Sequence, residues 1–548
     1  MNPNENKPNF LDRGTIQAMI VVLVLWVGWT KWIAYKYPPQ ISPPQTAAVV
    51  QQAVQAVPAN SSAPSAAVVQ GGAAGAGAVA ADLPEQYVDF EDDNLKFRLS
   101  SHGMGLHDID VKKYRTRSNE PIILGGVSGD YPFGTNLVET GRPIDFRIDK
   151  VGDDTFVGHA TVGALQIEKT MKVVSANFSL DTKVQVTGNF DGFKGLQTTM
   201  SEILAKPEAT GFFSRGSREY QDWFLRHDGT KTRKVIQYKD GLQLSENNVA
   251  IAALSTHYFS IAIVDRSDLL PKFASNVPAA AANVTGLLVY APISRPETFN
   301  LHYVGYAGPK SYEVLDRVDE NLPLVVDYGI FGFLGKPILW LLKFLYSVFG
   351  NWGWAIVGLT IVVRSIVMPF NAYSFKSMKA MQRIQPEMNR IKERYKDKPA
   401  DQKLQMNQEI MALMKANKAS PLGGCLPTLL QLPPFFALYQ VLGQSIELYR
   451  QPFIFWIHDL SAADPFYVLP VMMGATMFVQ QRITPTPMDP QQAKVMMFMP
   501  LIFATFMLQL PSGLTLYIFV STLFGIIQQY IFLRDKSTLQ SRVKEAKA

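Results

Sequence analysis

The sequence is poor in cysteine, in histidine and in charge. Its single cysteine, Cys425, excludes a disulfide framework and a cysteine-only zinc site. The seven histidines show no metal-ligand spacing, so we expect no metal and no cofactor. Charged residues make up 18% of the chain, below the roughly 25% of soluble proteins. The length of 548 residues permits two or more domains, and the apolar content excludes a disordered tail.

Basic residues are scarce where a nucleic-acid-binding domain would need them. Residues 84–322 contain 26 Lys+Arg and 31 Asp+Glu, a net charge of −5. Because the whole chain carries +6, the remaining residues carry +11. This division argues against nucleic-acid sequence recognition by the soluble-looking segment. It indicates a membrane protein whose flanking segments follow the positive-inside rule.

The N-terminal region contains an apolar run at 15–34 with no charge before Lys31, and a bilayer span needs about 20 residues. We predict a cytoplasmic N-terminus at 1–14 and a first transmembrane helix at 15–37 that acts as an uncleaved signal anchor. A cleaved signal peptide is the alternative. The segment 38–83 has neither charged nor aromatic residues up to residue 81, which predicts a flexible tether.

Residues 84–322 change character and contain short alternating runs. Lys183–Val186 and Thr285–Tyr290 are examples, and turn signals such as Asp191-Gly192 and Asp228-Gly229 separate such runs. This spacing predicts an all-β sandwich or barrel with one large core.

The rest of the chain is apolar in blocks, which predicts an α-helical transmembrane core. Residues 323–349 predict an amphipathic helix lying on the membrane surface. Five spans, two loops, a cytoplasmic helical hairpin and a basic tail follow: spans at 350–373, 421–448, 466–481, 496–510 and 514–533, an outer loop at 449–465, a cytoplasmic loop at 482–495, the hairpin at 374–420 and the tail at 534–548. With the first span this gives six, both termini inside and residues 38–349 outside.

Arg364 is the one charge well inside a predicted span. Such a charge costs about 2.5–3.5 kcal/mol even on the lenient insertion scale. One interpretation places it in a hydrated groove that meets polar parts of a client, and the alternative is snorkelling to the cytoplasmic end. Other polar residues of these spans could line the same groove, or only bond neighbouring helices. They include Gln431, Tyr517, Ser521 and Gln528.

The interiors of the five predicted spans after residue 350 contain no Asp, Glu or His. This absence argues against a proton- or sodium-coupled transporter. The segment Gly329–Lys336 superficially resembles a phosphate loop, but Pro337 stands where Ser or Thr should bind magnesium. We therefore expect no nucleotide site, no catalytic residue and no enzyme activity.

The hairpin segment 374–420 carries 11 Lys+Arg and five acids. Apolar residues at steps of three and four mark one helix stripe that ends near Tyr395, and a second helical stretch follows a turn at 396–401. The functional interpretation is a docking arm, and the alternative is that the stripe only pairs the hairpin with itself. The basic residues expected on this arm, which could also face lipid head groups, are Lys376, Lys379, Arg383, Arg390 and Arg394.

Several motifs, in this order and spacing, resemble the YidC membrane protein insertases, which have relatives in mitochondria and chloroplasts. The match covers about Val325 to Asp535, and the N-terminal span, tether and β-domain resemble the Gram-negative members. The motifs are Gly350-Asn-Trp-Gly-Trp354, Thr360–Pro369 with Arg364, Ser420–Cys425, Trp456–Leu460, Asp489-Pro490, Phe498-Met-Pro500 and Pro511–Leu514.

The resemblance implies a helical core with a positively charged hydrophilic groove that is open to the cytoplasm and to lipid. Arg364 would sit in the groove, Thr360 and Tyr517 near the client, and Trp456 at the outer interface. A periplasmic β-supersandwich, like that of galactose mutarotase, would precede the core. The implied function is insertion and folding of nascent membrane proteins in the bacterial inner membrane, alone or with the Sec translocon.

The resemblance also implies partners and leaves alternatives. Membrane lipids are expected partners, and the ribosome or the signal recognition particle receptor is a candidate one. The tail after Phe532 is short, with a charge of +3, which argues against strong ribosome binding through it. The alternatives are a lipid or solute transporter, and an outer binding module that the spans merely anchor.

Overall fold

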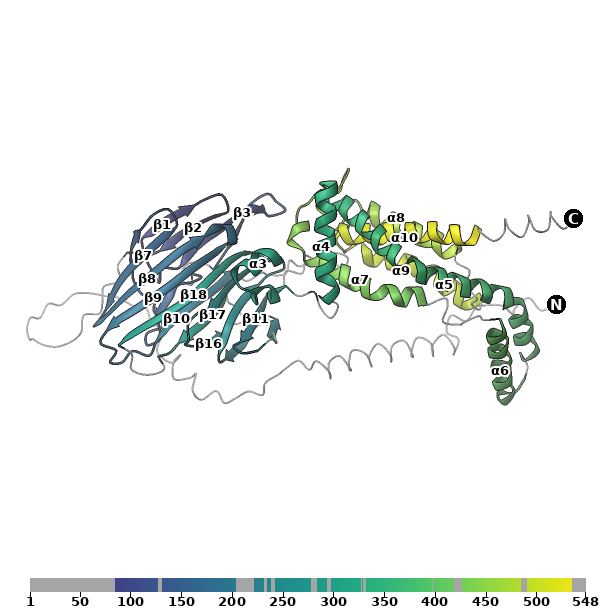
Figure 1. Ribbon diagram of the computed structural model, residues 1–548, viewed down its shortest axis with the longest axis horizontal. Coiled ribbons are helices and arrows are strands. Elements are labelled where there is room, and N and C mark those ends of the chain that lie inside the picture. Colours follow the sequence, from purple (N-terminus) through teal and green to yellow (C-terminus); the bar gives the residue numbers. More distant parts are fainter. Residues whose placement is uncertain are drawn as a thin grey trace, which may run out of the picture. The chain divides into compact units, whose positions relative to one another are not determined.

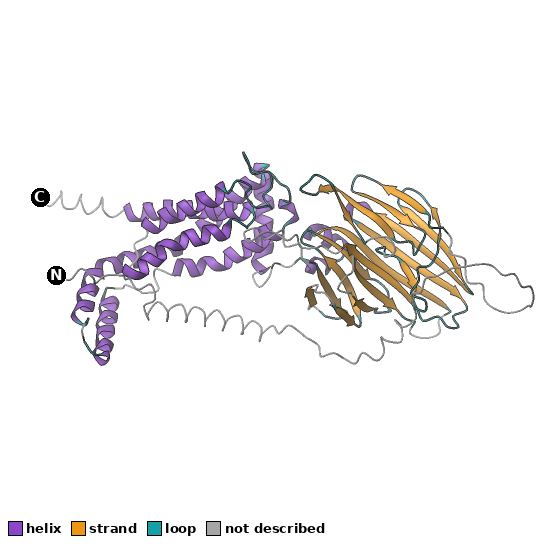
Figure 2. Ribbon diagram, turned by 180° about the vertical axis from the view of Figure 1, so that it is seen from behind, coloured by secondary structure: helices purple, strands orange, loops and turns teal. Residues whose placement is uncertain are grey.

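The computed structural model describes residues 84–534, apart from 127–130, 204–220, 231–233, 238–241, 277–282, 293–296, 327, 329–331, 397, 418–425 and 484–489. The predictions for the segments 1–14, 15–37, 38–83 and 535–548 lie outside the described residues. Figure 2 shows the strands gathered in one body and the long helices gathered in another.

The strands that the structure describes form three antiparallel sheets (Figure 1). A nine-stranded sheet has the order β12-β11-β14-β15-β18-β9-β8-β7-β6, a five-stranded sheet has the order β13-β16-β17-β10-β5, and a four-stranded sheet runs from β1 to β4. The strand bounds are β1 Tyr87–Glu91, β2 Leu95–Ser100, β3 Leu106–Arg115, β4 Pro121–Leu124, β5 Thr135–Leu137, β6 Arg147–Lys150, β7 Thr155–Val162, β8 Leu165–Val174, β9 Ser179–Gly188, β10 Leu196–Ile203, β11 Asp222–His227, β12 Lys234–Gln237, β13 Gln243–Glu246, β14 Val249–Ser255, β15 Phe259–Asp265, β16 Lys272–Asn276, β17 Asn283–Tyr290 and β18 Thr298–Pro309.

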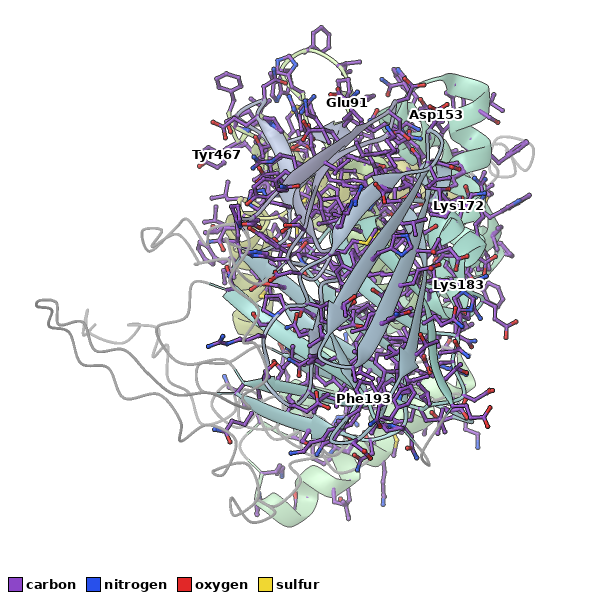
Figure 3. All side chains as sticks on the ribbon, turned by 90° about the vertical axis from the view of Figure 1, so that its left-hand side faces the viewer. Glu91, Asp153, Lys172, Lys183, Phe193 and Tyr467 are labelled. Carbon is purple, nitrogen blue, oxygen red and sulfur yellow. The ribbon has the colours of Figure 1, made fainter. Side chains whose placement is uncertain are left out.

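Alternation of the side chains builds the core of this β-sandwich. Along β8 and β9 buried residues alternate with exposed ones, and Lys172 and Lys183 lie on the exposed face (Figure 3). On the inner side Trp223 is fully buried and its ring lies 4.8 Å from that of Phe273. A Cβ at Gly286 would lie 2.4 Å from the Trp223 ring, so this position of β17 requires glycine.

A buried cation crosslinks loops inside the sandwich. Lys169 on β8 is fully buried, and its ammonium donates to the carbonyl oxygens of Gly103 at 3.0 Å, Met104 at 3.0 Å and Phe133 at 2.7 Å. Burial lowers the pKa of Lys169 well below its usual value. The three carbonyls satisfy all three ammonium protons, as a buried charge requires.

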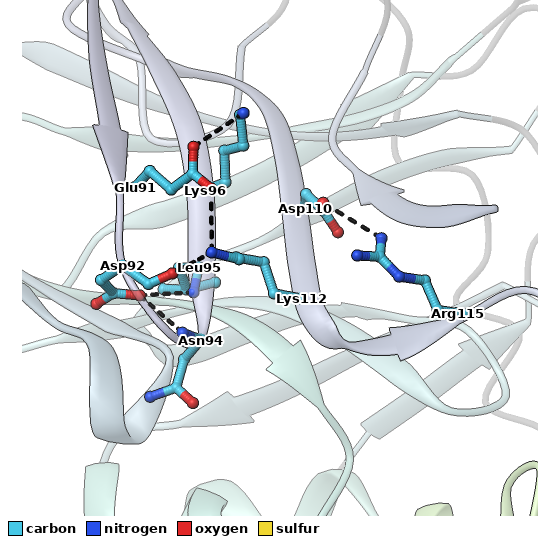
Figure 4. A network of polar contacts seen from close by, with 8 residues as sticks. All are labelled: Glu91, Asp92, Asn94, Leu95, Lys96, Asp110, Lys112 and Arg115. Atoms are coloured by element: carbon cyan, nitrogen blue, oxygen red, sulfur yellow. Dashed lines mark hydrogen bonds and ion pairs between the residues drawn. The ribbon is translucent and has the colours of Figure 1, made fainter. Parts of the chain in front are cut away.

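Ion pairs lie on the outer surface of the four-stranded sheet. Glu91 of β1 pairs with Lys96 at 2.9 Å and with Lys112 at 3.0 Å (Figure 4). These contacts lower the pKa of the Glu91 carboxyl. Because the group is exposed, these pairs contribute little to stability.

The helical part begins with α3, directly after β18. Three described helical stretches are long and apolar enough to cross a membrane: Gly332–Phe349, Trp352–Ala372 and Ser512–Ile531. The first of them is the helix that the sequence predicts on the membrane surface. The helix bounds are α3 Tyr312–Val318, α4 Gly332–Phe349, α5 Trp352–Arg394, α6 Ala400–Ala416, α7 Leu426–Gln444, α8 Val468–Ile483, α9 Pro490–Met507 and α10 Ser512–Arg534, with short 3-10 turns η1 Ser175–Asn177, η2 Leu322–Val325 and η4 Ile446–Leu448.

Helix α5 is one continuous helix of 43 residues. The Asn351 side chain caps its start by accepting from the backbone N–H of Trp354 at 3.2 Å. The helix contains Pro369 and Pro386 and continues past both. The expected boundary between span and hairpin, at residues 373 and 374, therefore falls inside one helix.

Helix α6 folds back against the end of α5 (Figure 1). Met381, Ile384 and Met388 of α5 and Ile410 of α6 form a small apolar cluster of their own. The apolar stripe of the sequence thus packs within this helix pair.

Candidate functional site

Arg364 and Ser521 join two helices in the apolar core. Arg364 on α5 donates from Nε to the Ser521 hydroxyl on α10 at 2.7 Å. Gln431 on α7 donates to the same hydroxyl oxygen at 3.3 Å. Seven residues further along both helices, Asn371 in the middle of α5 donates from Nδ2 to Oε1 of Gln528 at 3.4 Å. We call these five residues the polar seam.

The polar seam follows from the register of two parallel helices. Both α5–α10 hydrogen bonds join residues that are 157 positions apart. The spacing from Arg364 to Asn371 equals the spacing from Ser521 to Gln528, two turns of helix in each case. Polar residues therefore meet polar residues along the contact between α5 and α10.

Arg364 has neutral partners among the described residues. Its side chain is half-buried. The ionisable group that interacts with its charge is the Tyr517 hydroxyl rather than a carboxylate. A guanidinium has five N–H donors, of which the Ser521 bond uses one. Within the described part of the chain, Arg364 thus presents a positive charge and donors beyond the one bonded to Ser521 inside the helical core.

The other predicted groove residues are divided by burial. Thr360, Tyr517 and Gln528 are buried, whereas Gln431 is half-buried like Arg364. The Thr360 hydroxyl donates to the Ile356 carbonyl of its own helix at 2.6 Å. In this conformation Arg364 and Gln431 are the half-buried residues of the site.

A glycine of α10 lies beside the charge. A Cβ at Gly525 would lie 2.8 Å from the Gln480 amide nitrogen of α8 and 3.9 Å from a terminal guanidinium nitrogen of Arg364. Gly525 therefore leaves room in which side chains of α5 and α8 approach α10.

Trp456 belongs to a second polar arrangement, in the loop before α8. Its indole N–H donates to Asp464 Oδ1 at 3.1 Å. The same carboxylate accepts the backbone N–H of Phe466 at 3.0 Å and that of Leu469 at 2.7 Å. Asp464 is 2% exposed and holds the start of α8, so Trp456 is fixed to this helix terminus.

The predicted docking residues lie on the far part of α5. Arg383, Arg390 and Arg394 are exposed, and Arg394 pairs with Glu409 of α6 at 3.5 Å. The side chains of Lys376 and Lys379 lie outside the described residues. The hairpin thus offers at least three exposed guanidinium groups on one helix.

Sequence reasoning missed two members of these arrangements. Asn371 lies seven residues after Arg364, on the same helix face, and this spacing was the available signal. Asp464 precedes Pro465 and α8, where an acidic N-terminal cap is typical. Among the described residues no group of three or more His, Cys, Asp or Glu could hold a metal ion.

A β-sandwich domain joined to apolar helices, with an arginine held between two of those helices, defines a membrane protein with a large extramembrane domain. Residues 87–341 match the model of the YidC periplasmic domain, and residues 344–539 match the model of the 60Kd inner membrane protein. A membrane protein insertase YidC of Cupriavidus taiwanensis is 33% identical over 458 residues, covering 80% of this chain and 80% of the relative. The chain belongs to the YidC family of inner-membrane proteins.

Two further likenesses were found. A membrane protein insertase YidC of Pseudomonas fluorescens is 46% identical over 261 residues, covering 48% of this chain and 45% of the relative. A solved structure described as an active YidC insertase with the first transmembrane domain resolved is 17% identical, with a TM-score of 0.37, and covers 81% of this chain and 92% of that one.

Proposed function

We propose that this chain inserts nascent proteins into the bacterial inner membrane and assists their folding. The observation that carries the proposal is Arg364, a half-buried cation in an apolar helix whose described partner is a neutral serine. A structural arginine in a membrane is normally paired with a carboxylate or with several acceptors. One with unused donors suits a transient polar partner better than a permanent one.

The chemistry of the proposed client contact follows from the cost of polar groups in hydrocarbon. An unsatisfied backbone group costs several kcal/mol in the bilayer, on the order given by transfer measurements. The Arg364 guanidinium and the Gln431 amide would supply donors to carbonyls and carboxylates of a hydrophilic client segment. Its apolar helix would then leave sideways into lipid, which lowers the number of polar groups that face hydrocarbon at once.

The topology belongs to the same proposal. Six spans would place both termini and the α5–α6 hairpin in the cytoplasm, and residues 38–349 in the periplasm. The exposed arginines Arg383, Arg390 and Arg394 support a cytoplasmic hairpin, because positive residues favour that side. The hairpin would be the docking arm for the ribosome or the signal recognition particle receptor, and the Sec translocon would assist with some clients. Neither catalytic residues nor a cofactor enter this mechanism.

The test is site-specific crosslinking of a stalled nascent membrane protein. A photoreactive residue at Gln431, in the polar seam, should capture the client. The matched control is Ile366 of α5, which lies two residues after Arg364 and is 66% exposed on another face. Equal capture at both positions, or none at Gln431, would contradict a client contact at the seam. Uptake of a solute driven by an ion gradient in proteoliposomes would instead identify a transporter.

A further inference from the structure

A cavity of about 430 Å³ lies between α3, at the end of the β-sandwich, and α4. Its volume lies within the roughly 300–1,000 Å³ of small-ligand pockets. Polar and aromatic groups line it, and none of them enters the proposed insertion mechanism. They are Tyr312, Glu313, Tyr328, Lys336, Trp340, Lys343 and Phe344, and Leu339 completes the lining.

One face of α4 supplies two cations and an indole to this cavity. Lys336, Trp340 and Lys343 follow one another at steps of four and three residues, which places them on one helix face. Trp340 is 68% exposed and stacks on Phe344, with ring centroids 6.0 Å apart. An exposed tryptophan on an apolar helix is typical of the headgroup level of a membrane.

The two lysines differ in their partners. Lys343 is neutralised by two carboxylates, Glu313 at 3.0 Å and Glu447 at 2.9 Å. Lys336 donates to the Tyr312 hydroxyl at 2.7 Å and lies 4.6 Å from the centre of the same ring. Its described partners are therefore neutral. Because the Tyr312 oxygen accepts this bond, its own proton remains available to a ligand.

The cavity also presents an anionic group. The Glu313 side chain is 62% exposed, and one of its oxygens pairs with Lys343. Its second oxygen can accept from a ligand. The site thus combines a cation with a hydroxyl donor, at Lys336 and Tyr312, and a carboxylate acceptor at Glu313.

We infer that this cavity binds the phosphoethanolamine headgroup of a membrane phospholipid. The lipid phosphate accepts from Lys336 and Tyr312, and the primary ammonium donates to Glu313 with Trp340 beside it. A choline headgroup has no N–H to donate, and a glycerol headgroup has no charge for Glu313. The inference rests on the proposed placement of α4 at the outer membrane surface, where such headgroups lie.

The test is competitive lipid retention by the full-length detergent-purified protein, measured by native mass spectrometry. Phosphatidylethanolamine, phosphatidylglycerol and phosphatidylcholine with identical acyl chains are added in equal amounts. We expect phosphatidylethanolamine to be retained at least fivefold over the other two. Lys336→Gln removes the cation that binds the phosphate and should lower retention of all three lipids, whereas Lys183→Gln, on the exposed face of β9, should not.

A second variant separates the two ends of the headgroup. Glu313→Gln should lower phosphatidylethanolamine retention to the level of phosphatidylglycerol and leave phosphatidylglycerol unchanged. Unaltered retention in Lys336→Gln, or stronger retention of phosphatidylglycerol than of phosphatidylethanolamine by the unmodified protein, would overturn the inference. Arg364→Ala should weaken insertion but keep lipid retention, so failure of either proposal is seen separately.

Discussion

The Arg364 guanidinium of α5 and the Ser521 hydroxyl of α10 are hydrogen-bonded at 2.7 Å. The bond orients the charge from a neighbouring helix without neutralising it. Arg364 is therefore held in place by a partner that leaves its positive charge available. Substitutions that remove the charge of Arg364 should therefore have larger effects than substitutions of Ser521, which keep it.

Arg364→Ala should reduce client insertion by about ten- to a hundredfold, because a charge-assisted hydrogen bond contributes about 1.5–3 kcal/mol and about 1.4 kcal/mol is a factor of ten. Ser521→Ala removes one orienting bond but keeps the charge, so insertion should fall less, by about two- to tenfold. The measurement is protease protection of a single-span client in proteoliposomes, with the amount of folded protein as a control. Arg364→Lys should retain most activity, and full activity of Arg364→Leu would disprove a role for the charge.

The Asn371–Gln528 bond should stabilise the contact of α5 with α10. Both side chains are buried, so replacing either by Leu leaves the other amide without its partner. Each single substitution should destabilise the protein by about 1–2 kcal/mol, and the double substitution by less than the sum. Unfolding in detergent measures this cycle. Strictly additive losses would mean that the two amides do not interact.

The sequence identified single residues of this site but not how they pair. Arg364, Gln431, Ser521 and Gln528 were recognisable singly, because polar residues in apolar spans are rare. The pairing required the register between two helices that are distant in sequence, and local spacing does not contain that register. The hydrogen bond between Asn371 and Gln528 was missed for this reason.

The same limit applies to the fold. Alternating runs predicted the strands of the β-domain, and Thr285–Tyr290 lies within β17. The sheet order was not predictable, because β10 pairs with β5 on one side and with β17 on the other, which is a nonlocal choice. The composition change after residue 373 suggested a boundary. Composition sets which solvent a helix meets and does not by itself end a helix, so α5 continues through residue 373.

Asp464→Ala should destabilise the start of α8 by about 1–2 kcal/mol, since it removes the acceptor for two backbone N–H groups. Trp456→Phe keeps an aromatic ring and loses one donor, so its cost should be about 1 kcal/mol or less. Denaturant unfolding in detergent gives both values. The control is Asp316→Ala, an exposed carboxylate of α3, which should change little. An equal effect of Asp464→Ala and Asp316→Ala would refute the cap.

Glu202 of β10 should make the β-domain less stable as the pH rises. Burial raises the pKa of its carboxyl to about 8 from 4.5, against the backbone N–H groups of Gly125 and Ile203, which lower it. Between these pH values the folded state binds more protons than the unfolded state, so stability falls with rising pH. The loss should reach a few kcal/mol, at about 1.36 kcal/mol per pKa unit.

Glu202→Gln should remove this dependence. Hydrogen exchange of β10 in the full-length protein, compared at pH 5 and pH 8 after correction for intrinsic exchange, would show it. Glu168→Gln, at an exposed position of β8, is the matched control and should keep the dependence of the unmodified protein. Parallel profiles for Glu202→Gln and the unmodified protein would contradict a buried, proton-binding carboxyl.

The continuity of α5 gives the molecule a mechanical property. Its 43 residues correspond to about 65 Å of helix at about 1.5 Å per residue, roughly twice the thickness of a hydrocarbon core of about 30 Å. Pro369 lies between Arg364 and Asn371 and removes one backbone hydrogen bond there, so α5 bends more easily at this turn, as it does at Pro386. A force on the hairpin would therefore bend α5 at these prolines instead of moving it as one rigid helix. Because Asn371 lies on the hairpin side of Pro369, a bend at Pro369 would strain the Asn371–Gln528 hydrogen bond first and leave the Arg364–Ser521 hydrogen bond intact.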